Sequence, residues 1–565
     1  MRFQAAVARA TLSVSPVSLL LAWTDWAGRL AGSPGKRLEL LNLAQEQARR
    51  FTEYAAALAM SRADCPAQQC VEPPARDKRF VDPAWNHWPF NLMHQSFLLA
   101  EEWWQAATTG VGGVSPHHEH IVSFAARQWL DVFSPGNYLP TNPLVLQRTF
   151  ESAGINLMRG LSNLAEDVGR NLTGQPPAGS EAFVVGRDVG VTPGKVVLRT
   201  RLIELIQYTP TTAKVRPEPI LIVPAWIMKY YILDLSPHNS LVRYLVGQGY
   251  TVFCISWKNP GRAEAELGMD DYLQLGFFAA LDAINSIVPG RKVHATGYCL
   301  GGTLLAIANA AMARDGDDRL ASMNLFTAQT DFTEPGELAL FIDEGEVSLL
   351  EAQMQETGYL TAGQMAGAFQ LLRSYDLMWS RMVGEYLMGE RPPMNDLMAW
   401  NADATRMPAR MHGQYLRQLF LNDALSEGRY LVGGKPVSLS DIDTPTFCVA
   451  TVTDHVAPWR SVHKIHYLTS VDLRFVLTSG GHNAGIVSEP GRPRRSYQAL
   501  DRPAGANYIS PDDWLKLAPQ HEGSWWEDWA AWLDAHSGQA VAPPAIGSAD
   551  YPPLADAPGS YVLEK

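Results

Sequence analysis

The sequence predicts an α/β fold, with a mostly parallel β-sheet and crossover helices, preceded by a mostly helical region. Two observations lead to this prediction. Beyond about residue 195, short apolar runs alternate with helix-like segments, as is typical of strands buried on both faces. The runs are residues 200–208, 219–224, 250–257, 292–299, 323–326, 446–451 and 473–477. Before residue 195, apolar residues instead recur at helical spacing, as in 36–57 and 90–107.

These patterns divide the chain into three predicted parts. Residues 1–195 form a helical N-terminal domain that ends in a segment rich in Gly and Pro, 169–194. Residues 196–536 form the catalytic domain with the sheet, and strand signals vanish within it between about 334 and 428. We expect that stretch to be an inserted helical cap. Residues 537–565, rich in Pro, Ala and Gly, are expected to form an extended C-terminal tail on the surface.

Composition and charge narrow the class of protein. Of the 565 residues, 46% are apolar and 18% are charged, which is typical of a globular chain. The net charge of −12 argues against nucleic acid as a partner, because nonspecific binding needs a basic face. The five cysteines are few and odd in number, which favours a reducing cytoplasm over a secreted disulfide framework. The apolar run at 17–23 is short, so we expect neither a signal peptide nor a transmembrane segment.

The motif Gly-Tyr-Cys-Leu-Gly-Gly at 297–302 lies where a predicted strand meets a predicted helix. It has the form of the nucleophile elbow, Gly-x-Ser-x-Gly, with Cys299 in place of serine. The elbow strains the backbone of its central residue, and its glycines let the turn pack closely. The helix that follows directs its N-terminus at the nucleophile, which favours a thiolate. We therefore predict Cys299 as the nucleophile and the backbone N–H of Leu300 as an oxyanion-hole donor.

Two later strand ends supply an acid and a histidine in the chain order of an α/β-hydrolase fold. Asp454 follows the run at 446–451, and His482 stands among glycines after the run at 473–477. Side chains just beyond the carboxyl ends of parallel strands project into a shared crevice. Taken singly, Asp454 could be a helix N-cap and His482 a surface-loop residue. Together and in this order, they predict a catalytic pair on an α/β-hydrolase fold with an inserted helical cap.

Other histidines are weaker candidates. His455 lies directly beside the predicted acid, but adjacent residues point in different directions. His463 and His466 share a helix face, and we interpret them as structural. The sequence His-His-Glu-His at 117–120 suggests a metal only superficially, because the predicted helical region offers no second ligand group nearby. We expect a solvated turn at that position and no metal site in the chain.

These motifs together resemble those of the polyhydroxyalkanoate synthases. The motif at 297–302 matches the lipase-like box of that family, Gly-x-Cys-x-Gly-Gly, and residues 454–459 and 481–485 resemble its aspartate and histidine segments. Further likenesses are Lys-Tyr-Tyr-Ile-Leu-Asp-Leu at 229–235, Trp-Asn at 400–401, and Phe-x-x-Pro-x-Trp at 80–85. The resemblance spans about 80–530, which is most of the chain. Family members often carry Asn where this chain has Met228, in a loop expected near the oxyanion hole.

The resemblance implies a poly(3-hydroxyalkanoate) polymerase, an acyltransferase that works in the cytoplasm on polyester granules, with a homodimer as its active form. Its substrates would be (R)-3-hydroxyacyl-CoA thioesters. We expect 3-hydroxybutyryl-CoA, because the pattern is more similar to the single-subunit short-chain enzymes. The resemblance also implies Cys299 as nucleophile, His482 as general base and Asp454 as its partner. No cofactor is expected, because CoA is only the leaving group of the substrate.

Two alternatives stay open at the level of sequence. A thioesterase or an intracellular polyester depolymerase on the same fold would carry the same elbow, so the elbow alone does not separate hydrolysis from synthesis. A non-catalytic granule-coat protein would use the aromatic N-terminal region to bind polyester, and the intact Cys299, Asp454 and His482 argue against it. The cap and the helical domain favour synthesis.

Overall fold

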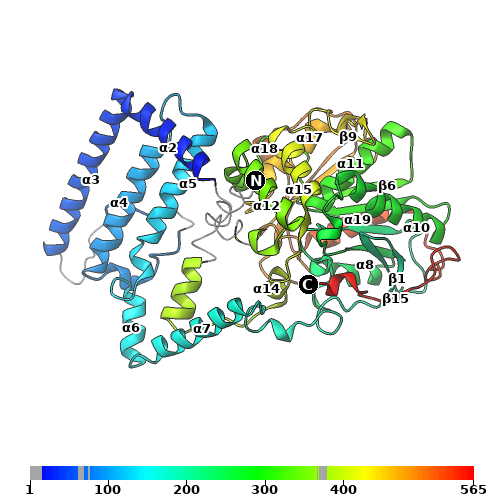
Figure 1. Cartoon of the computed structure of the whole chain (residues 1–565), viewed down its shortest axis with the longest axis horizontal. Coiled ribbons are helices and arrows are strands. Elements are labelled where there is room, and N and C mark those ends of the chain that lie inside the picture. The colour runs from blue at the N-terminus through cyan, green and yellow to red at the C-terminus, as the bar shows by residue number, and fades with distance from the viewer. Residues whose placement is uncertain (1–14, 61–68, 74–76, 366, 368–377) are drawn as a thin grey trace. The chain divides into compact units, whose positions relative to one another are not determined.

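The computed structural model describes residues 15–60, 69–73, 77–365, 367 and 378–565, and their contacts divide them into two compact units (Figure 1). The sheet unit comprises residues 179–365 and 394–565. The helical unit comprises the described residues of 15–178 together with 367 and 378–393. The first change of unit, at residue 178, falls inside the Gly- and Pro-rich segment 169–194, whereas the predicted helical domain ends at 195.

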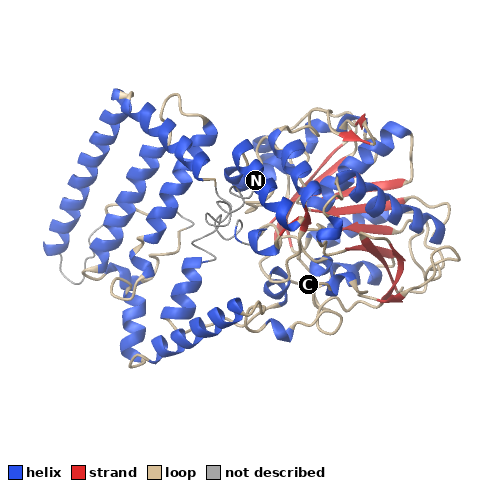
Figure 2. Cartoon of the chain, in the orientation of Figure 1, coloured by secondary structure: helices blue, strands red, loops and turns tan. Residues whose placement is uncertain are grey.

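The sheet unit is built on a mixed β-sheet, drawn red in Figure 2. Within the described residues it has 11 strands, in the order β14-β13-β12-β11-β6-β5-β3-β4-β2-β1-β15. The central strands β4, β3, β5, β6, β11 and β12 are parallel, and the strands at both sides pair antiparallel. The bounds are β1 Gly194–Arg199, β2 Ile203–Tyr208, β3 Ile220–Val223, β4 Val252–Trp257, β5 Val293–Tyr298, β6 Leu320–Phe326, β11 Thr446–Thr451, β12 Leu473–Thr478, β13 Ser496–Arg502, β14 Gln520–Glu522 and β15 Ala555–Asp556.

Each of the seven predicted apolar runs overlaps a strand of this sheet, so the predicted α/β architecture is confirmed. The sequence analysis did not predict β1, β13, β14 or β15. These four strands pair antiparallel at the sides of the sheet. Along β13, buried residues alternate with half-buried ones. A strand that is covered on one face only carries no continuous apolar run, which is the signal that revealed the central strands.

The two faces of the sheet are covered by different helices, because successive residues of a strand point to opposite sides. On β3, Leu221 and Val223 pack into one apolar core with helices α10 (Ala279–Ile287) and α11 (Leu300–Asp315). Ile220 and Ile222 pack into a second core with α8 (Leu241–Gly247) and α19 (Trp525–Ala535). The sheet is therefore a buried middle layer, and only the ends of its strands are free to build a site.

The stretch predicted as a helical cap, 334–428, is divided between the two units. Its part in the sheet unit contains α12 (Glu344–Thr357), α14 (Asp396–Asn401) and α15 (Ala409–Tyr415). It also contains a short antiparallel pair that was not expected, β7 (Tyr359–Leu360) with β8 (Met407–Pro408). Strands of two residues are too short to show a period in the sequence.

The helical unit consists of helices whose starts the sequence encodes locally. Proline occupies the first turn of α2, α5 and α6, and a Ser or Asn before it caps the helix with its side chain. The described helices are α2 (Pro16–Ala31), α3 (Pro34–Met60), α4 (Phe90–Thr108), α5 (Pro116–Val132), α6 (Pro143–Glu151) and α7 (Ile155–Leu172), together with the π-helical turn η9 (Met382–Leu387). Phe80, Trp85, Phe97 and Leu98 form its small buried apolar cluster.

Residues 378–393 approach α7 closely through their backbone. A Cβ atom at Gly160 would lie 1.8 Å from the carbonyl oxygen of Tyr386, so only glycine fits at that position of α7. The side-chain amide of Asn163 donates to the carbonyl of Glu385 at 3.0 Å, and that of Asn156 donates to Leu387 at 2.8 Å. Backbone contact at this distance makes the segment an integral part of the helical unit.

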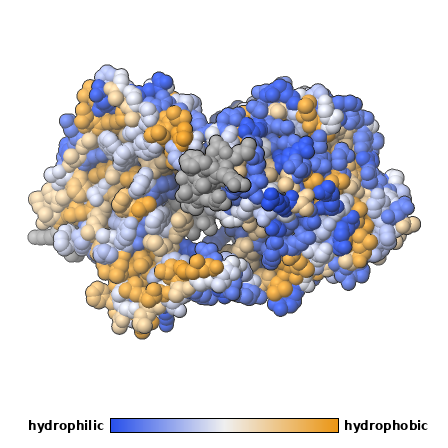
Figure 3. All heavy atoms as spheres, in the orientation of Figure 1, coloured by the Kyte–Doolittle hydropathy of each residue, from blue (hydrophilic) through white to orange (hydrophobic). Residues whose placement is uncertain are grey.

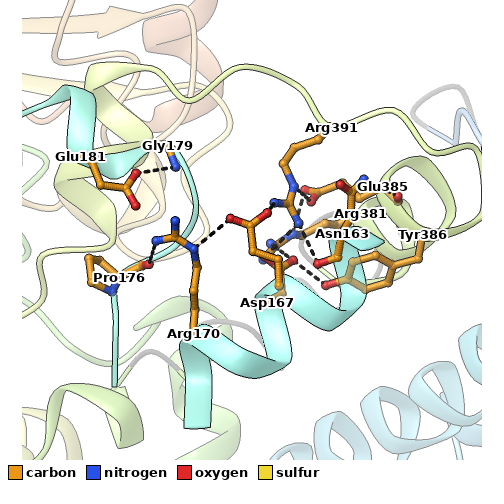
Figure 4. Close-up of polar contacts among 11 residues, drawn as sticks. Asn163, Asp167, Arg170, Pro176, Gly179, Glu181, Arg381, Glu385, Tyr386 and Arg391 are labelled. Carbon is orange, nitrogen blue, oxygen red and sulfur yellow. Dashed lines mark hydrogen bonds and ion pairs between the residues drawn. The ribbon is translucent and has the colours of Figure 1, made fainter. Parts of the chain in front are cut away.

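An ionic network covers the same contact (Figure 4). The guanidinium of Arg391 lies 2.8 Å from Asp167 and 2.9 Å from both Glu166 and Glu385. Arg381 lies 2.9 Å from Asp167 and 2.8 Å from Glu385. Each arginine therefore bridges α7 and η9, and the network is stronger than isolated surface pairs because several charges share partners.

Two further features concern the chain as a whole. The tail from Ser537 was expected to lie extended on the surface. In the structure it adds β15 to the sheet beside β1, and it buries Val562.

Of the helices in the described residues, none is both long enough and apolar enough to cross a membrane.

Candidate active site

The nucleophile elbow is formed where β5 ends and α11 begins. Cys299 stands at this junction with φ 53° and ψ −123°, a strained conformation for a residue with a Cβ atom. Its backbone N–H donates to the carbonyl of Phe326 on the neighbouring strand β6 at 2.9 Å. The strained residue is thus held by the sheet, and its half-buried thiol lies at the carboxyl end of the parallel strands.

The glycines of the motif are required by close packing. A Cβ atom at Gly297 would lie 2.4 Å from the Cα of Gly302. A Cβ at Gly301 would lie 2.0 Å from the carbonyl oxygen of Val223, where β3 ends. One at Gly302 would lie 2.4 Å from the Cβ of Ala328. The strand–helix turn can therefore reach this sharpness only with glycine at these positions.

Asp454 and His482 form a hydrogen-bonded pair at the ends of β11 and β12. The Nδ1 atom of His482 lies 2.7 Å from Oδ2 of Asp454, whose side chain is fully buried. The backbone N–H groups of Val456 and Ala457 both donate to Oδ1 of Asp454 at 2.9 Å. Thr451 donates its hydroxyl to Oδ2 at 3.1 Å. This carboxylate is held in one orientation and fixes the tautomer of the imidazole.

Cys299 lies close enough to His482 for its charge to act on the imidazole, so the structure brings the three predicted residues together. Burial works against a charged imidazole, but the charges of Asp454 and Cys299 and the hydrogen bond to Asp454 raise the pKa of His482 well above its usual range. Burial likewise works against a charged Asp454, but the charge and hydrogen bond of His482 and the two backbone donors lower the pKa of this carboxyl. The imidazole is thus well suited to accept a proton from the thiol.

Leu300 is the first residue of α11, directly after the nucleophile. The first N–H groups of a helix have no acceptor within it, and the helix dipole adds a partial positive charge there. Met228 lies in the loop after β3 and pairs with Ala404 in an isolated antiparallel bridge. The carbonyls of Val223 and Pro224, at the start of this loop, lie against Gly301.

The weaker candidates take other places. The carbonyl of His455 accepts a hydrogen bond from Glu337, while its neighbour Asp454 serves His482. His463 and His466 stack on each other with their ring centroids 3.8 Å apart. The sequence at 117–120 lies in the first turn of α5, not in a solvated turn, and His118 is 2.8 Å from Asp25. Across the described part of the chain, no group of three or more His, Cys, Asp or Glu side chains is placed to hold a metal.

Two residues at the site were missed by the sequence analysis. Tyr298 donates its hydroxyl to Oδ1 of Asn483 at 2.5 Å. Tyr298 directly precedes the nucleophile, and Asn483 directly follows the histidine. A polar side chain in each motif was the available signal, but only the fold shows that the two side chains meet.

The arrangement is suited to acyl transfer. A thiol on a strained turn, with an imidazole that accepts its proton and a buried carboxylate behind the imidazole, is the constellation for nucleophilic attack on a carbonyl. The N-terminus of α11 provides N–H donors beside the sulfur atom for the developing oxyanion. This geometry alone does not distinguish transfer to water from transfer to another hydroxyl.

Comparison with known proteins identifies the kind of chain that carries this site. Residues 76–245 match the model of the poly-beta-hydroxybutyrate polymerase (PhaC) N-terminus, and residues 1–36 match a second poly-beta-hydroxybutyrate polymerase N-terminal model. Residues 218–489 match the alpha/beta hydrolase fold, which confirms the predicted fold class.

Individual relatives extend the match over most of the chain. A poly(3-hydroxyalkanoate) polymerase of Methylorubrum extorquens is 42% identical, covering 88% of this chain and 82% of that one. The poly(3-hydroxyalkanoate) polymerase subunit PhaC of Rhizobium etli is 39% identical, covering 87% and 78%. The corresponding subunit of Cupriavidus necator is 37% identical, covering 95% and 90%.

Proposed function

The chain belongs to the poly(3-hydroxyalkanoate) polymerase family and is an acyltransferase-type polymerase, and from this premise we propose that it polymerises (R)-3-hydroxyacyl-CoA with release of CoA. We further propose 3-hydroxybutyryl-CoA as the monomer and an acyl thioester on Cys299 as the intermediate. The observation that carries the proposal is the placement of Cys299, at the nucleophile elbow, beside the hydrogen-bonded pair His482–Asp454.

In the first step, His482 accepts the proton of the Cys299 thiol, and the thiolate attacks the thioester carbonyl. The N–H of Leu300 donates to the oxyanion that forms. The bond between the carbonyl carbon and the sulfur of CoA then breaks, the CoA thiolate takes up the proton, and a 3-hydroxyacyl thioester of Cys299 remains. One thioester replaces another, so the step is nearly balanced in energy.

In the second step, the 3-hydroxyl of another acyl group attacks the thioester on Cys299. His482 accepts the hydroxyl proton, and Asp454 holds the imidazole and stabilises its positive charge. The carbon–sulfur bond breaks, an ester bond forms and the thiol of Cys299 is restored. Water is the competing nucleophile, and the burial of the His482 side chain to 10% exposure helps to exclude it.

The test is Cys299→Ser in the full chain, supplied with 3-hydroxybutyryl-CoA. We expect CoA release and polymer formation to fall by roughly 10³-fold or more, because the nucleophile is lost. Cys70→Ser is the matched control, since Cys70 is also a half-buried free thiol but lies in the helical unit. Substantial polymerisation by Cys299→Ser would contradict the proposal.

The same assay separates the polymerase from a thioesterase or depolymerase. Polymer in near-stoichiometric yield with CoA supports synthesis, whereas free 3-hydroxybutyrate as the main product would mean hydrolysis. A mass increase of one 3-hydroxybutyryl group on the peptide that contains Cys299, absent in Cys299→Ser, would identify the intermediate directly.

We also propose that the chain works in the cytoplasm at the surface of polyester granules, as a homodimer. Figure 3 shows apolar side chains gathered over the part of the helical unit where α6 and α7 are labelled in Figure 1. These exposed residues include Phe150, Ile155, Met158, Leu161 and Leu172. An apolar surface of this kind supports contact with polyester or with a second copy. Fractionation with isolated granules and light scattering of the free chain test the two parts separately.

A further inference from the structure

One buried hydrogen bond connects the two catalytic motifs. Tyr298 is the last residue of β5 and precedes Cys299, and its hydroxyl donates to Oδ1 of Asn483 at 2.5 Å. Asn483 directly follows His482, and Tyr298 is only 2% exposed. The rings of Tyr298 and His482 lie with their centroids 5.7 Å apart. The residue before the nucleophile is therefore bonded to the residue after the histidine.

The sheet order shows why such a connection is needed. Cys299 follows β5 and His482 follows β12, and β6 and β11 lie between these two strands. Three strand spacings of about 4.8 Å separate the starting points by roughly 14 Å. The imidazole reaches the sulfur only if the loop after β12 leans toward β5. Asp454 holds Nδ1 from the end of β11, which is only one strand spacing nearer to β5.

The other contacts of the loop after β12 hold it from elsewhere. Arg495 donates to the carbonyls of Ser479 and Ala484, at 3.0 Å and 2.5 Å. Thr453 donates its backbone N–H to Gly480 at 3.0 Å, and the indole of Trp525 donates to Gly485 at 3.0 Å. These contacts come from the turn before β13, the end of β11 and α19. Among the hydrogen bonds of the described residues, that of Asn483 is the one that reaches this loop from β5, the nucleophile's own strand.

We propose that Tyr298 and Asn483 are positioning residues, which set the His482 imidazole against the Cys299 thiol through their shared hydrogen bond. This inference rests on the proposed function, because it assigns the pair a role in the acyl transfer carried out at Cys299. The pair acts through His482 and takes no part in bond making.

The chemistry of the two side chains suits a permanent contact. Burial, with the nearby charges of Cys299 and Asp454, raises the pKa of Tyr298 well above its usual range, so its hydroxyl stays a donor at all working pH values. The backbone N–H groups of Ile486 and Val487 both bond to the carbonyl of Asn483, at 3.1 Å and 3.0 Å, so its backbone is fixed as well. Because both the side chain and the backbone of Asn483 are held by hydrogen bonds, the adjacent His482 is held in position as well.

The test compares Tyr298→Phe, Asn483→Leu and the double variant in the full chain. We expect each single variant to lower kcat for CoA release from 3-hydroxybutyryl-CoA by about 10-fold to 100-fold, with KM nearly unchanged, because small displacements of a catalytic group are costly. The double variant should lose much less than the product of the two single losses, because both substitutions break the same contact. Tyr250→Phe is the matched control, since Tyr250 is also 2% exposed but precedes β4 at the opposite end of the sheet.

A second readout distinguishes positioning from general stability. The rate at which iodoacetamide alkylates Cys299 is measured against pH, since it reports the ionisation of the thiol beside His482. We expect the pH midpoint of this alkylation rate to shift in Tyr298→Phe and not in Tyr250→Phe. Wild-type kcat and midpoint in Tyr298→Phe would overturn the inference, as would a loss of rate with an unchanged midpoint and a lowered Tm. If instead Cys299→Ser remained active, the proposed function itself would fail, which is a different result.

Discussion

His482, with its side chain 10% exposed, and the buried pair His463–His466 all lie in the sheet unit, yet their pKa values shift in opposite directions. Burial lowers the pKa of His463 to about 3 and that of His466 to about 4, and the charges of His466 and Arg502 add to the effect on His463. At His482 burial has the same sign, but the carboxylate of Asp454 and the sulfur of Cys299 outweigh it and raise the pKa.

The difference lies in the partners. The stacked rings of His463 and His466 pack against Phe475, and within the described residues neither ring nitrogen of His463 has a hydrogen-bond partner. Such an imidazole is stable only when neutral. His482 has an acceptor on Nδ1 and a thiol beside it, so its cationic form is stabilised once it accepts a proton. Burial makes the pKa of each histidine sensitive to nearby charges. The hydrogen-bond partners of the ring then decide which protonation state the fold favours.

The largest expected effect comes from removing that partner. Asp454→Asn should lower the rate of CoA release from 3-hydroxybutyryl-CoA by roughly 10²-fold to 10⁴-fold, because the imidazole loses its orienting acceptor and its compensating charge. The pKa of His482 should fall toward that of a buried neutral histidine. Steady-state kinetics and the pH dependence of Cys299 alkylation measure both changes. Asp443→Asn, at an exposed position before β11, is the control.

A rate within threefold of the wild type in Asp454→Asn would mean that the carboxylate is not the partner that separates the two histidine sites. An unchanged pH midpoint for the alkylation of Cys299 would mean that Asp454 is not the group that raises the pKa of His482.

The effect of the stacked pair His463–His466 should instead appear as a loss of folding stability at acid pH. In the folded chain both rings are neutral down to about pH 4, whereas in the unfolded chain they titrate near pH 6.5. The stability from these depressed pKa values is therefore complete above pH 6.5 and is lost as the pH falls below it. The expected loss is about 1.4 kcal/mol per histidine for each pH unit between 6.5 and 4.

His463→Phe tests this, because phenylalanine can stack on His466 without a proton to gain. Its Tm should fall less than that of the wild type between pH 7.5 and pH 5, while CoA release at pH 7.5 stays close to the wild-type rate. Parallel Tm curves for the two chains would show that His463 is not the group that titrates.

The smallest effect is expected at the ionic network between α7 and η9, where the charges are partly exposed. Arg391, with its side chain 21% exposed, contacts three carboxylates, so Arg391→Met should destabilise the attachment of residues 378–393 by roughly 1–2 kcal/mol. Faster hydrogen exchange at the amides of 382–388 would report it, and 1 M salt should reduce the difference. Arg460→Met removes a single exposed pair and is the control. Equal exchange in both variants would mean that the ion pairs of Arg391 do not hold the segment.

Local patterns in the sequence were enough to predict much of the fold. The central strands are buried on both faces, so each stands out as a short, mostly apolar run, such as 446–451 for β11. The elbow was recognisable because a sharp strand–helix turn needs glycine at 297, 301 and 302, whatever surrounds it. The antiparallel strands β13 and β14 left no such signal, because half-covered strands mix polar and apolar residues.

Proximity across the chain was decided by the tertiary structure. The order of Cys299, Asp454 and His482 along the sequence was suggestive, but their contact depends on the order in which β5, β6, β11 and β12 lie side by side. The bond between Tyr298 and Asn483 joins residues that 184 others separate in the chain, as the sequence numbering shows. The attachment of 378–393 to α7 depends on Gly160 in the same way.

By itself, the sequence determined which residue types stand at strand ends and turns, because those depend on the conformation of a few neighbouring residues. Only the tertiary structure decided which of these residues meet, and therefore at which histidine the cationic form is favoured and at which the neutral form. The reason is that a pKa depends on the charges and water within a few ångströms of a group, and those neighbours come from distant parts of the chain.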